Sequence, residues 1–353
     1  MNKLALIASM TAFLLCGCKE MPEKPEDDLT IELEGWVISK STYDFDINPR
    51  DMFFVDGNIG FVVGYNGVIY KTTDSGTTWR KLNSGTTLHL HSVCFIDENT
   101  GFVSSQTMDG CLDADCDKGS VLLKTINGGN TWTKTFFPEY IRILSLKFFD
   151  PLNGLAIIHK KDIPNSRDEY VATTSDGGSN WNLLDLGIKP YSSSLYFVDN
   201  IAFVAGENNQ IFKSKDYGRT WQTISTPIES NYDIRNICFY NENIGYVDGI
   251  TQIYKTIDGG VNWEETNFPF NYFGTFHFSS ENEGFNLQPV AVYDGRDFPT
   301  FKGSFSYETM DGGITWTKSE LMKSLYLGMT CFPRKDLGYG FNFSEFSIIK
   351  KKE

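Results

Sequence analysis

A nine-residue pattern that recurs six times constrains the fold of this chain more than any other feature. After one leading residue, each copy has the form Ser/Thr-x-Asp-x-Gly-x-Thr/Asn-Trp, with Asn127 replacing Asp in the second copy. The Asp or Asn side chain and the Ser/Thr hydroxyl can accept hydrogen bonds from a turn, and Gly supplies the positive φ of a tight hairpin. Each copy therefore predicts a hairpin whose Trp begins the outgoing strand. The segments are KTTDSGTTW (71–79), KTINGGNTW (124–132), TTSDGGSNW (173–181), KSKDYGRTW (213–221), KTIDGGVNW (255–263) and ETMDGGITW (308–316).

A second pattern precedes each hairpin: an apolar strand, a polar turn, and a strand that begins with Gly and an aromatic or apolar residue in most copies. Each repeat then holds four short strands, and four-stranded units repeated around an axis form a β-propeller. A seventh copy of this pattern, CFPRKDLGYGFN (331–342), has no hairpin pattern after it. The other copies are FFVDGNIGFVVG (53–64), CFIDENTGFVSS (94–105), KFFDPLNGLAII (147–158), YFVDNIAFVAG (196–206), CFYNENIGYVDG (238–249) and HFSSENEGFNLQ (277–288).

The two ends of the chain complement each other. The last repeat stops after Ser347–Lys350, which matches a third strand, and lacks its fourth. Gly35–Ser39 has the form of that missing strand, with Trp36 in the position that Trp occupies elsewhere. We therefore predict an all-β fold: a seven-bladed β-propeller with four-stranded blades, closed by an N-terminal strand that completes the last blade. Closure protects strand edges that an open ring would expose.

The first residues have the character of an export signal. Lys3 is followed by the apolar run Leu4–Leu15 and by Leu15-Cys16-Gly17-Cys18, which resembles a bacterial lipobox. We predict a lipoprotein signal peptide at residues 1–17, a lipidated Cys18 with a flexible tether over 18–34, and the propeller over 35–353. The predicted location is the bacterial cell envelope, at the outer membrane, with the side of the membrane left open. Acyl chains on Cys18 would supply the membrane contact.

Charge limits the partners. The chain has 45 acidic and 31 basic residues, giving a formal net charge of −14. Nucleic-acid binding needs a basic surface, so we expect no nucleic-acid partner.

The repeated motifs resemble the photosystem II stability/assembly factor family of Asp-box (bacterial neuraminidase repeat) propellers. The resemblance covers about residues 35–353 and depends on F-x-D-x-x-x-G-aromatic followed by K-T-x-D-G-G-x-T-W. It implies a scaffold that binds partner proteins and is not an enzyme. Nothing in the sequence indicates a photosynthetic host, so the resemblance is not extended to a photosystem role.

Asp-boxes also occur in sialidases and xyloglucan hydrolases, so the box is informative about fold and weakly informative about function. The segment Ile141-Arg142-Ile143-Leu144 lacks the Pro of the sialidase Phe-Arg-Ile-Pro motif, and the chain has room for one propeller, whereas xyloglucan hydrolases use two. A carbohydrate-binding or glycoside-hydrolase-like propeller remains the alternative function. Its glycan would stack on aromatic side chains such as Tyr140, Tyr191, Tyr232 and Tyr272.

Candidate ligand residues are expected on the face that carries the links between blades, away from the Asp-box turns. Arg50, His91 and Arg235 each lie three residues before an inner strand, and Arg142, Tyr293 and Arg296 are further candidates. They could bind an anionic segment or peptide, or they could pair with nearby acids such as Asp51 and Asp233. Three insertions, 104–119, 159–169 and 286–305, extend this face. The box residues Asp74, Asn127, Asp176, Asp216, Asp258 and Asp311 are expected to stabilise turns.

No cofactor is expected, and the metal candidates are incomplete. Asp113, Asp115 and Asp117 alternate as in the first half of a calcium loop, but Lys118 stands where such a loop needs Gly. A solvated loop closed by a Cys111–Cys116 disulfide is the alternative. Cys94, Cys238 and Cys331 share one repeat position in blades that are not adjacent, so we expect them to be free buried thiols. The sequence therefore favours a non-catalytic, lipid-anchored scaffold that binds a protein or peptide in the cell envelope.

Overall fold

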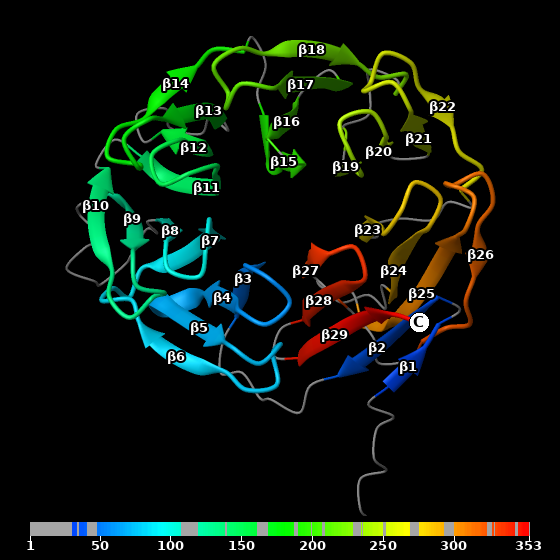
Figure 1. Ribbon diagram of the computed structural model, residues 1–353, viewed down its shortest axis with the longest axis horizontal. Helices are drawn as coiled ribbons and strands as arrows, with labels where there is room; N and C mark the ends of the chain where they lie inside the picture. Colours follow the sequence, from blue (N-terminus) through cyan, green and yellow to red (C-terminus); the bar gives the residue numbers. More distant parts are fainter. Residues whose placement is uncertain are drawn as a thin grey trace, which may run out of the picture.

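The computed structural model is an all-β propeller in which the strands surround a central channel (Figure 1). The innermost strands β3, β7, β11, β15, β19, β23 and β27 face the channel. The described part contains the short 3-10 turn η1 (Tyr65–Gly67) and no α-helix. The structure describes residues 30–33, 35–40, 48–106, 119–137, 140–160, 169–186, 190–198, 200–206, 209–228, 234, 236–249, 252–268, 275–292, 300–322, 327, 329–342 and 345–352.

Four sheets match the predicted four-stranded unit, with strands in sequential order from the channel outward. The first and second are β3(Pro49–Phe54), β4(Gly60–Gly64), β5(Val68–Thr72), β6(Arg80–Asn83), and β15(Pro190–Val198), β16(Ile201–Gly206), β17(Gln210–Ser214), β18(Gln222–Ser225). The third and fourth are β19(Asn236–Phe239), β20(Gly245–Asp248), β21(Ile253–Thr256), β22(Glu264–Glu265), and β23(Thr275–Phe278), β24(Gly284–Val292), β25(Thr300–Thr309), β26(Thr317–Lys318).

The number of separate sheets differs from the prediction. Seven were expected, but the described strands form six, because one sheet has eight strands. A single residue pair, Arg142 with Gln106, joins β11 to β8 and merges two four-stranded runs. The expectation of seven separate four-stranded sheets is therefore wrong. The merged runs are β7(His89–Phe95), β8(Gly101–Gln106), β9(Ser120–Thr125), β10(Thr133–Phe137) and β11(Tyr140–Phe148), β12(Gly154–Lys160), β13(Glu169–Thr174), β14(Asn182–Leu184).

The ring closes where the two ends of the chain meet. β2(Trp36–Lys40) pairs with β29(Glu345–Lys351), so that Trp36 lies opposite Lys351 and Lys40 opposite Ser347. β28(Leu337–Asn342) and β27(Met329–Arg334) continue this sheet inward. The predicted pairing of one N-terminal strand with three C-terminal strands is confirmed. An unexpected strand, β1(Thr30–Glu32), covers the outer edge of β2, so the sheet includes part of the segment predicted as tether.

Each Asp-box turn has nearly the same hydrogen bonds. In the first, the Thr72 hydroxyl donates to Asp74 Oδ1 at 2.8 Å and accepts from the Gly76 N–H at 2.9 Å. Asp74 also accepts from the Thr78 N–H at 2.8 Å and from the Thr78 hydroxyl at 2.6 Å. Gly76 has φ +83°, which explains why Gly is needed there. The prediction that the box residues stabilise turns agrees with these contacts.

Asn127, which replaces Asp in the second Asp-box, forms two hydrogen bonds with Thr131. Its Oδ1 accepts from the Thr131 N–H at 3.0 Å, while its Nδ2 donates to the Thr131 hydroxyl at 2.8 Å. A hydroxyl can either donate or accept, so Thr131 accommodates an amide where other boxes have a carboxylate. The Asp258 box differs, because the residue facing Asp258 Oδ2 is Asn262, whose Nδ2 donates at 2.7 Å.

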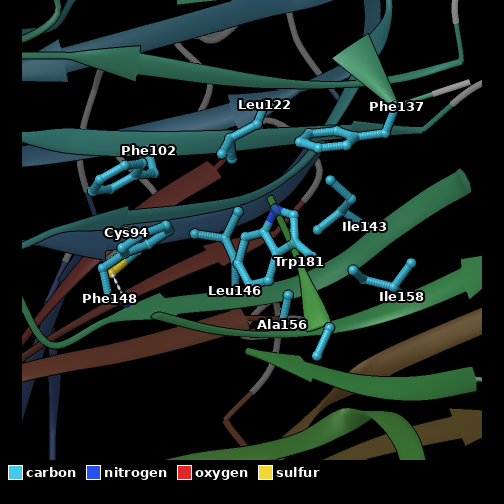
Figure 2. Close-up of a cluster of buried hydrophobic side chains, with 11 residues drawn as sticks. Cys94, Phe102, Leu122, Phe137, Ile143, Leu146, Phe148, Ala156, Ile158 and Trp181 are labelled. Carbon is cyan, nitrogen blue, oxygen red and sulfur yellow. Dashed lines mark hydrogen bonds between the residues drawn. The ribbon is translucent and has the colours of Figure 1, made fainter. Parts of the chain in front are cut away.

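The Gly-aromatic motif of the second strands explains how neighbouring sheets pack. Phe61 stacks on Phe95 of the next inner strand with centroids 3.7 Å apart. Gly60, just before it, leaves room for Phe54 of its own sheet, because a Cβ at Gly60 would lie 2.4 Å from that ring. Figure 2 shows the next such contact, Phe102 on Phe148 at 3.5 Å, inside a cluster that includes Cys94, Leu146 and Trp181. Other stacked pairs are Phe203–Phe239, Tyr246–Phe278 and Phe54–Tyr339.

Hydrogen bonds identify the two faces of the ring. The Gly128, Gly259 and Gly312 N–H groups of three Asp-box turns donate to Asn99, Asn243 and Asn282 carbonyls at 2.7–2.8 Å. These carbonyls belong to turns that follow inner strands, so inner strands end on the Asp-box face and begin on the opposite face, which we call the link face. Most of the predicted insertion 286–305 is not a loop, because β24 and β25 remain paired as far as Val292 and Thr300.

Candidate functional site

Of the residues predicted for the link face, the structure describes Arg50, His91 and Arg142. These side chains lie in β3, β7 and β11, at or near the start of three consecutive inner strands. The charges of Arg50 and Arg142 both lower the pKa of His91, which places both guanidinium groups on the same side of the ring as His91. Three other candidates, Arg235, Tyr293 and Arg296, lie outside the described residues.

Bulges in the inner strands position two of these side chains. The pairing register shifts between Pro49 and Asp51 and again between Leu90 and Ser92, which leaves Arg50 and His91 as the extra residues. A bulge turns its extra residue away from the regular strand direction. The His91 Nδ1 lies 2.8 Å from the Leu144 carbonyl in the third strand, and Leu144 is itself at a register shift. The bulges in β7 and β11 therefore hold these two neighbouring inner strands together through the contact between His91 and Leu144.

Arg50 belongs to a stack on the link face. Its guanidinium lies 4.6 Å from the Tyr65 ring centroid and donates to the Tyr65 hydroxyl. The Tyr65 ring stacks on His89 at 4.3 Å, and the Asn66 N–H donates to His89 Nδ1 at 3.2 Å. Burial, with a smaller effect of Arg50, lowers the pKa of His89. A neutral His89 under a cationic Arg50 gives a flat basic and aromatic surface, which we call the Arg50 stack (Arg50, Tyr65 and His89).

Asp51, named above as a possible partner of Arg50, forms its hydrogen bonds with other groups. Its carboxylate accepts from the Met52 N–H at 2.8 Å and from the Val93 N–H and the Ser92 hydroxyl at 2.9 Å each. Burial raises the pKa of Asp51, and the charge of Lys147 opposes this rise. The proposed Arg50–Asp51 pairing is therefore wrong: Asp51 links two inner strands. Within the described ranges, the structure shows no carboxylate in contact with Arg50.

Burial also lowers the pKa of His91, and both Arg50 and Arg142 lower it further. Hydrogen bonding to Leu144 and the charge of Asp51 act in the opposite sense. His91 is therefore neutral at physiological pH, and Arg50 and Arg142 are exposed cations at this end of the channel. This arrangement suits binding of an anionic group, and no nucleophile with a general base appears among its described residues.

The structure reveals a second feature that sequence reasoning missed. Inner strands β15, β19, β23 and β27 line a pocket of about 460 Å³. In the ring, β27 is the neighbour of β3, which carries Arg50, so the pocket and the Arg50 stack differ in the end of the channel that they occupy (Figure 1). The pocket lies where these strands end, close to the Asp-box face, whereas ligands were expected on the link face. Among the described residues that line it there is no Asp or Glu, and so no pair of facing carboxylates of the kind that glycoside hydrolysis requires.

The cysteines partly match expectation. Cys94, Cys238 and Cys331 are free thiols; Cys94 is buried and the other two are half-buried. Cys94 Sγ accepts from the Phe148 N–H at 3.4 Å (Figure 2). Burial raises the pKa of Cys238 and of Cys331 to about 11 each, so both are protonated thiols at neutral pH.

Several predictions concern residues outside the described ranges. They include Cys18, the Cys111–Cys116 disulfide, the calcium candidates Asp113, Asp115 and Asp117, and the side chains of Tyr140, Tyr191, Tyr232 and Tyr272. In the part of the chain that is described, no three His, Cys, Asp or Glu side chains are grouped to hold a metal ion. No helix among the described residues is long and apolar enough to span a membrane.

Comparison with curated proteins finds photosystem II assembly proteins. The family model described as "Photosynthesis system II assembly factor YCF48" matches residues 173–275. The "Photosystem II assembly lipoprotein Ycf48" of Nostoc sp. is 26% identical over 191 residues, covering 52% of this chain and 50% of that protein. The protein of the same name from Prochlorococcus marinus is 56% identical over 36 residues, 10% of this chain and 11% of that protein. The chain thus spans at most about half of these relatives.

Solved structures show the same fold over most of the chain. "YCF48 bound to D1 peptide" has a TM-score of 0.65 at 16% identity, covering 91% of this chain and 99% of that one. The GH74 enzyme of Niastella koreensis has a TM-score of 0.63 at 14% identity, covering 88% of this chain and 53% of that one. The second match shows that the fold is shared with hydrolases, so the fold alone does not assign activity. Together, these matches confirm that the chain resembles the photosystem II assembly factor propellers, as its repeats predicted.

Proposed function

We propose that this protein is a non-catalytic propeller scaffold, or assembly factor, that binds an anionic peptide segment of a partner protein on its link face. The observation that carries the proposal is the Arg50 stack, with its exposed guanidinium 4.6 Å from the Tyr65 centroid and Arg142 exposed nearby. An Arg held flat on an aromatic ring offers hydrogen bonds to carboxylates and an apolar surface for the rest of a peptide.

Two further points support a peptide ligand. The body of the protein is strongly acidic, so an anionic segment gains most by binding where two arginines lie near the same side chain, His91. One relative with this fold was solved with a peptide bound, the D1 peptide.

A binding assay with peptides of graded charge tests this function. The probes are labelled 12-residue peptides of fixed aromatic content whose net charge varies from about −4 to +4, measured by fluorescence polarisation. Affinity should rise with negative charge, and the double variant Arg50→Glu/Arg142→Glu should weaken binding of the acidic peptides about tenfold or more.

Arg219→Glu is the matched control. Arg219 also lies over a tyrosine ring, 5.9 Å from the Tyr217 centroid, but it belongs to an Asp-box turn on the other face. Its substitution should leave peptide affinity unchanged. Affinity that does not depend on peptide charge, or an equal loss in the control, would overturn the proposed site.

We also propose that the eight-stranded sheet acts as two blades, which gives the propeller seven. Its two halves repeat the same four-strand order, and one residue pair, Arg142 with Gln106, connects them. An experimental density map should show seven radial units around the channel. A map with six units, or with continuous pairing between β8 and β11, would contradict this count.

Finally, we propose that residues 1–17 are removed and that lipid on Cys18 anchors the protein in the cell envelope. The basis is the Gly17-Cys18 junction after an apolar run, together with the name of the relatives, which are called lipoproteins. Metabolic labelling with a radioactive fatty acid should mark the wild type and not Cys18→Ala, and the variant should leave the membrane fraction. Membrane separation then identifies the membrane. Labelling of Cys18→Ala would disprove this anchor.

A further inference from the structure

The pocket at the Asp-box end of the channel has the chemistry of a ligand site that is separate from the Arg50 stack. Its volume of about 460 Å³ falls within the range of roughly 300–1,000 Å³ that small-ligand pockets occupy. The ends of four inner strands line it.

Aromatic rings form its wall, and their polar atoms are already bonded within the protein. His277 stacks on Phe332 with centroids 3.6 Å apart, and its Nε2 lies 3.2 Å from the Lys335 carbonyl. The Tyr196 hydroxyl donates to the Phe239 carbonyl at 3.1 Å. A ligand would therefore meet ring and thiol surface beside the polar groups of Thr330, Arg334 and Lys335, which suits a body that is apolar at one end and polar at the other.

The mouth of the pocket is basic. The Lys335 ammonium lies 3.8 Å from the Tyr240 ring centroid and donates to the Tyr240 hydroxyl. The neighbouring Arg334 is paired with Asp336, with Nε donating to Oδ1 at 2.9 Å. Lys335 is exposed, and the structure shows no carboxylate bound to its ammonium among the described residues. It can therefore receive an anion without first losing an ion pair.

The charge of this lining contrasts with that of the whole chain. Although 45 of the 353 residues are acidic, none of the described lining residues is Asp or Glu, while Arg334 and Lys335 both line the pocket. An anion is thus repelled by the body of the protein and attracted at this mouth.

We propose that this pocket binds a carboxylate carried on an apolar, ring-sized body, with the ring against Phe332 and His277 and the carboxylate at Lys335. Two sources present this chemistry: a free arylalkanoic acid, and the C-terminal residue of a peptide that ends in an aromatic side chain. The site lies at the opposite end of the channel from the Arg50 stack and does not depend on the function proposed there.

Calorimetric titration of the full propeller tests the proposal with two matched pairs of probes. One pair is 3-phenylpropionate and 3-phenylpropanamide; the other is N-acetyl-Gly-Gly-Phe with a free or an amidated C-terminus. In each pair that binds, the carboxylate form should bind about tenfold more tightly than the amide, because only it can form a charge-assisted hydrogen bond with Lys335. Comparing the two acids identifies the source.

Two variants and one control connect binding to the pocket. Lys335→Gln should reduce the affinity of the carboxylate about tenfold and leave that of the amide unchanged. Thr330→Phe, which places a ring in the pocket, should abolish binding of both. Lys318→Gln is the control, because Lys318 also lies over a ring, 3.7 Å from the Phe305 centroid, yet does not line the pocket.

The result that overturns the proposal is equal affinity for acid and amide, or no binding of any probe by a protein whose thermal transition is intact. Full binding by the Thr330→Phe variant would also exclude this pocket. The Arg50→Glu/Arg142→Glu variant should retain the affinity, which keeps this test independent of the link face.

Discussion

The Asp-box turns recur in six repeats and the inner strands in seven, each at an equivalent place, yet the turns are nearly uniform and the inner strands vary. Each box places a hydroxyl, a carboxylate or amide, and a Gly in the same contacts. The inner strands place five different residue types before the recurring aromatic ring in their seven copies. Those side chains are Phe53, Cys94, Lys147, Tyr196, Cys238, His277 and Cys331.

This difference distinguishes the residues that stabilise the fold, in the Asp-box turns, from the residues that can contact a ligand, in the inner strands. Uniform turns give a uniform ring, because the same bonds must be satisfied in each copy. At the variable position, different side chains form different hydrogen bonds to the next inner strand. The Cys94 thiol accepts from the Phe148 N–H, whereas the Tyr196 hydroxyl donates to the Phe239 carbonyl. Variation there changes the channel wall and leaves the ring intact, so the two ends of one channel can differ in chemistry.

The largest expected effect tests whether the copies act as one cooperative unit. Deleting residues 30–40 removes Leu33, Trp36 and Ile38, which are 6%, 3% and 0% exposed. Loss of three such side chains costs about 6 kcal/mol at about 2 kcal/mol each, which is comparable to the stability of a whole domain. Calorimetry should show no cooperative transition. Removing residues 1–29 instead should leave the transition unchanged; an intact transition in the 30–40 deletion would contradict closure by β2.

The second prediction concerns the uniform turns. A Cβ at Gly76 would lie 2.2 Å from the Phe346 ring, and its φ of +83° already disfavours other residues. Gly76→Ala should therefore destabilise the protein by about 3 kcal/mol. Gly85 has a similar φ of +72°, but its nearest neighbour would be Lys134 Cε at 3.6 Å. Gly85→Ala should cost about 1 kcal/mol. Equal costs in denaturant unfolding would mean that backbone strain, and not the contact with Phe346, dominates.

The third prediction concerns the variable position. Burial lowers the pKa of His277 to about 4, against about 6.5 in the unfolded chain. As the pH falls from 6.5 towards 4, the unfolded state takes up a proton that the folded state does not, so stability is lost over that window. The free energy of unfolding of the wild type should therefore fall between pH 7 and pH 4.5 by on the order of 1–2 kcal/mol more than that of His277→Phe. Denaturant midpoints at pH 7 and pH 4.5 measure it, and identical pH profiles would show that His277 does not contribute.

The smallest effect separates two kinds of Asp-box. Asp74→Asn should be tolerated, because the Thr78 hydroxyl can become an acceptor, as Thr131 does for Asn127. Asp258→Asn would place its amide against the Asn262 amide, so we expect the melting temperature to fall by about 2 °C.

The dependence of stability on acid pH provides a second test of the same Asp-box residues. Hydrogen bonds from Asn262 lower the pKa of Asp258 to about 2, below its unfolded value near 3.8. The stabilisation is present above pH 3.8 and is lost as the pH falls towards 2. Asp258→Asn should lack this dependence. Equal melting temperatures for the Asp74 and Asp258 variants would contradict the role assigned to the facing side chain.

Much of the fold could be predicted because the same short sequence patterns recur in each repeat. The Asp-boxes predicted the hairpins, and Trp36 at the wrong end of the chain predicted how the ring closes. The β8–β11 contact could not be predicted, because it depends on one pair, Arg142 with Gln106, at the ends of two strands. Likewise, β1 was missed because the pattern preceding Trp36 is too short to distinguish from a charged linker.

The sites were harder to predict than the fold. Counting back from the inner strands found Arg50 and His91, but it could not show that Asp51 binds Ser92 and Val93 in the neighbouring strand. The pocket was missed because its wall joins residues from four repeats. Comparing the residue before each conserved ring, copy by copy, would have indicated it, since Tyr196, Cys238 and His277 occur in successive repeats.

The position of β1 has a mechanical consequence. It is a three-residue strand whose one partner among the described strands is β2, through Thr30–Ser39, Ile31–Ile38 and Glu32–Val37. A load that arrives at Thr30 from the preceding residues would act on this hairpin before it acts on β2. Trp36, packed on Phe285 with centroids 4.7 Å apart, comes under tension only after β1 has detached. The short outer strand would therefore act as a sacrificial link, lengthening the connection under force while β2 keeps the ring closed.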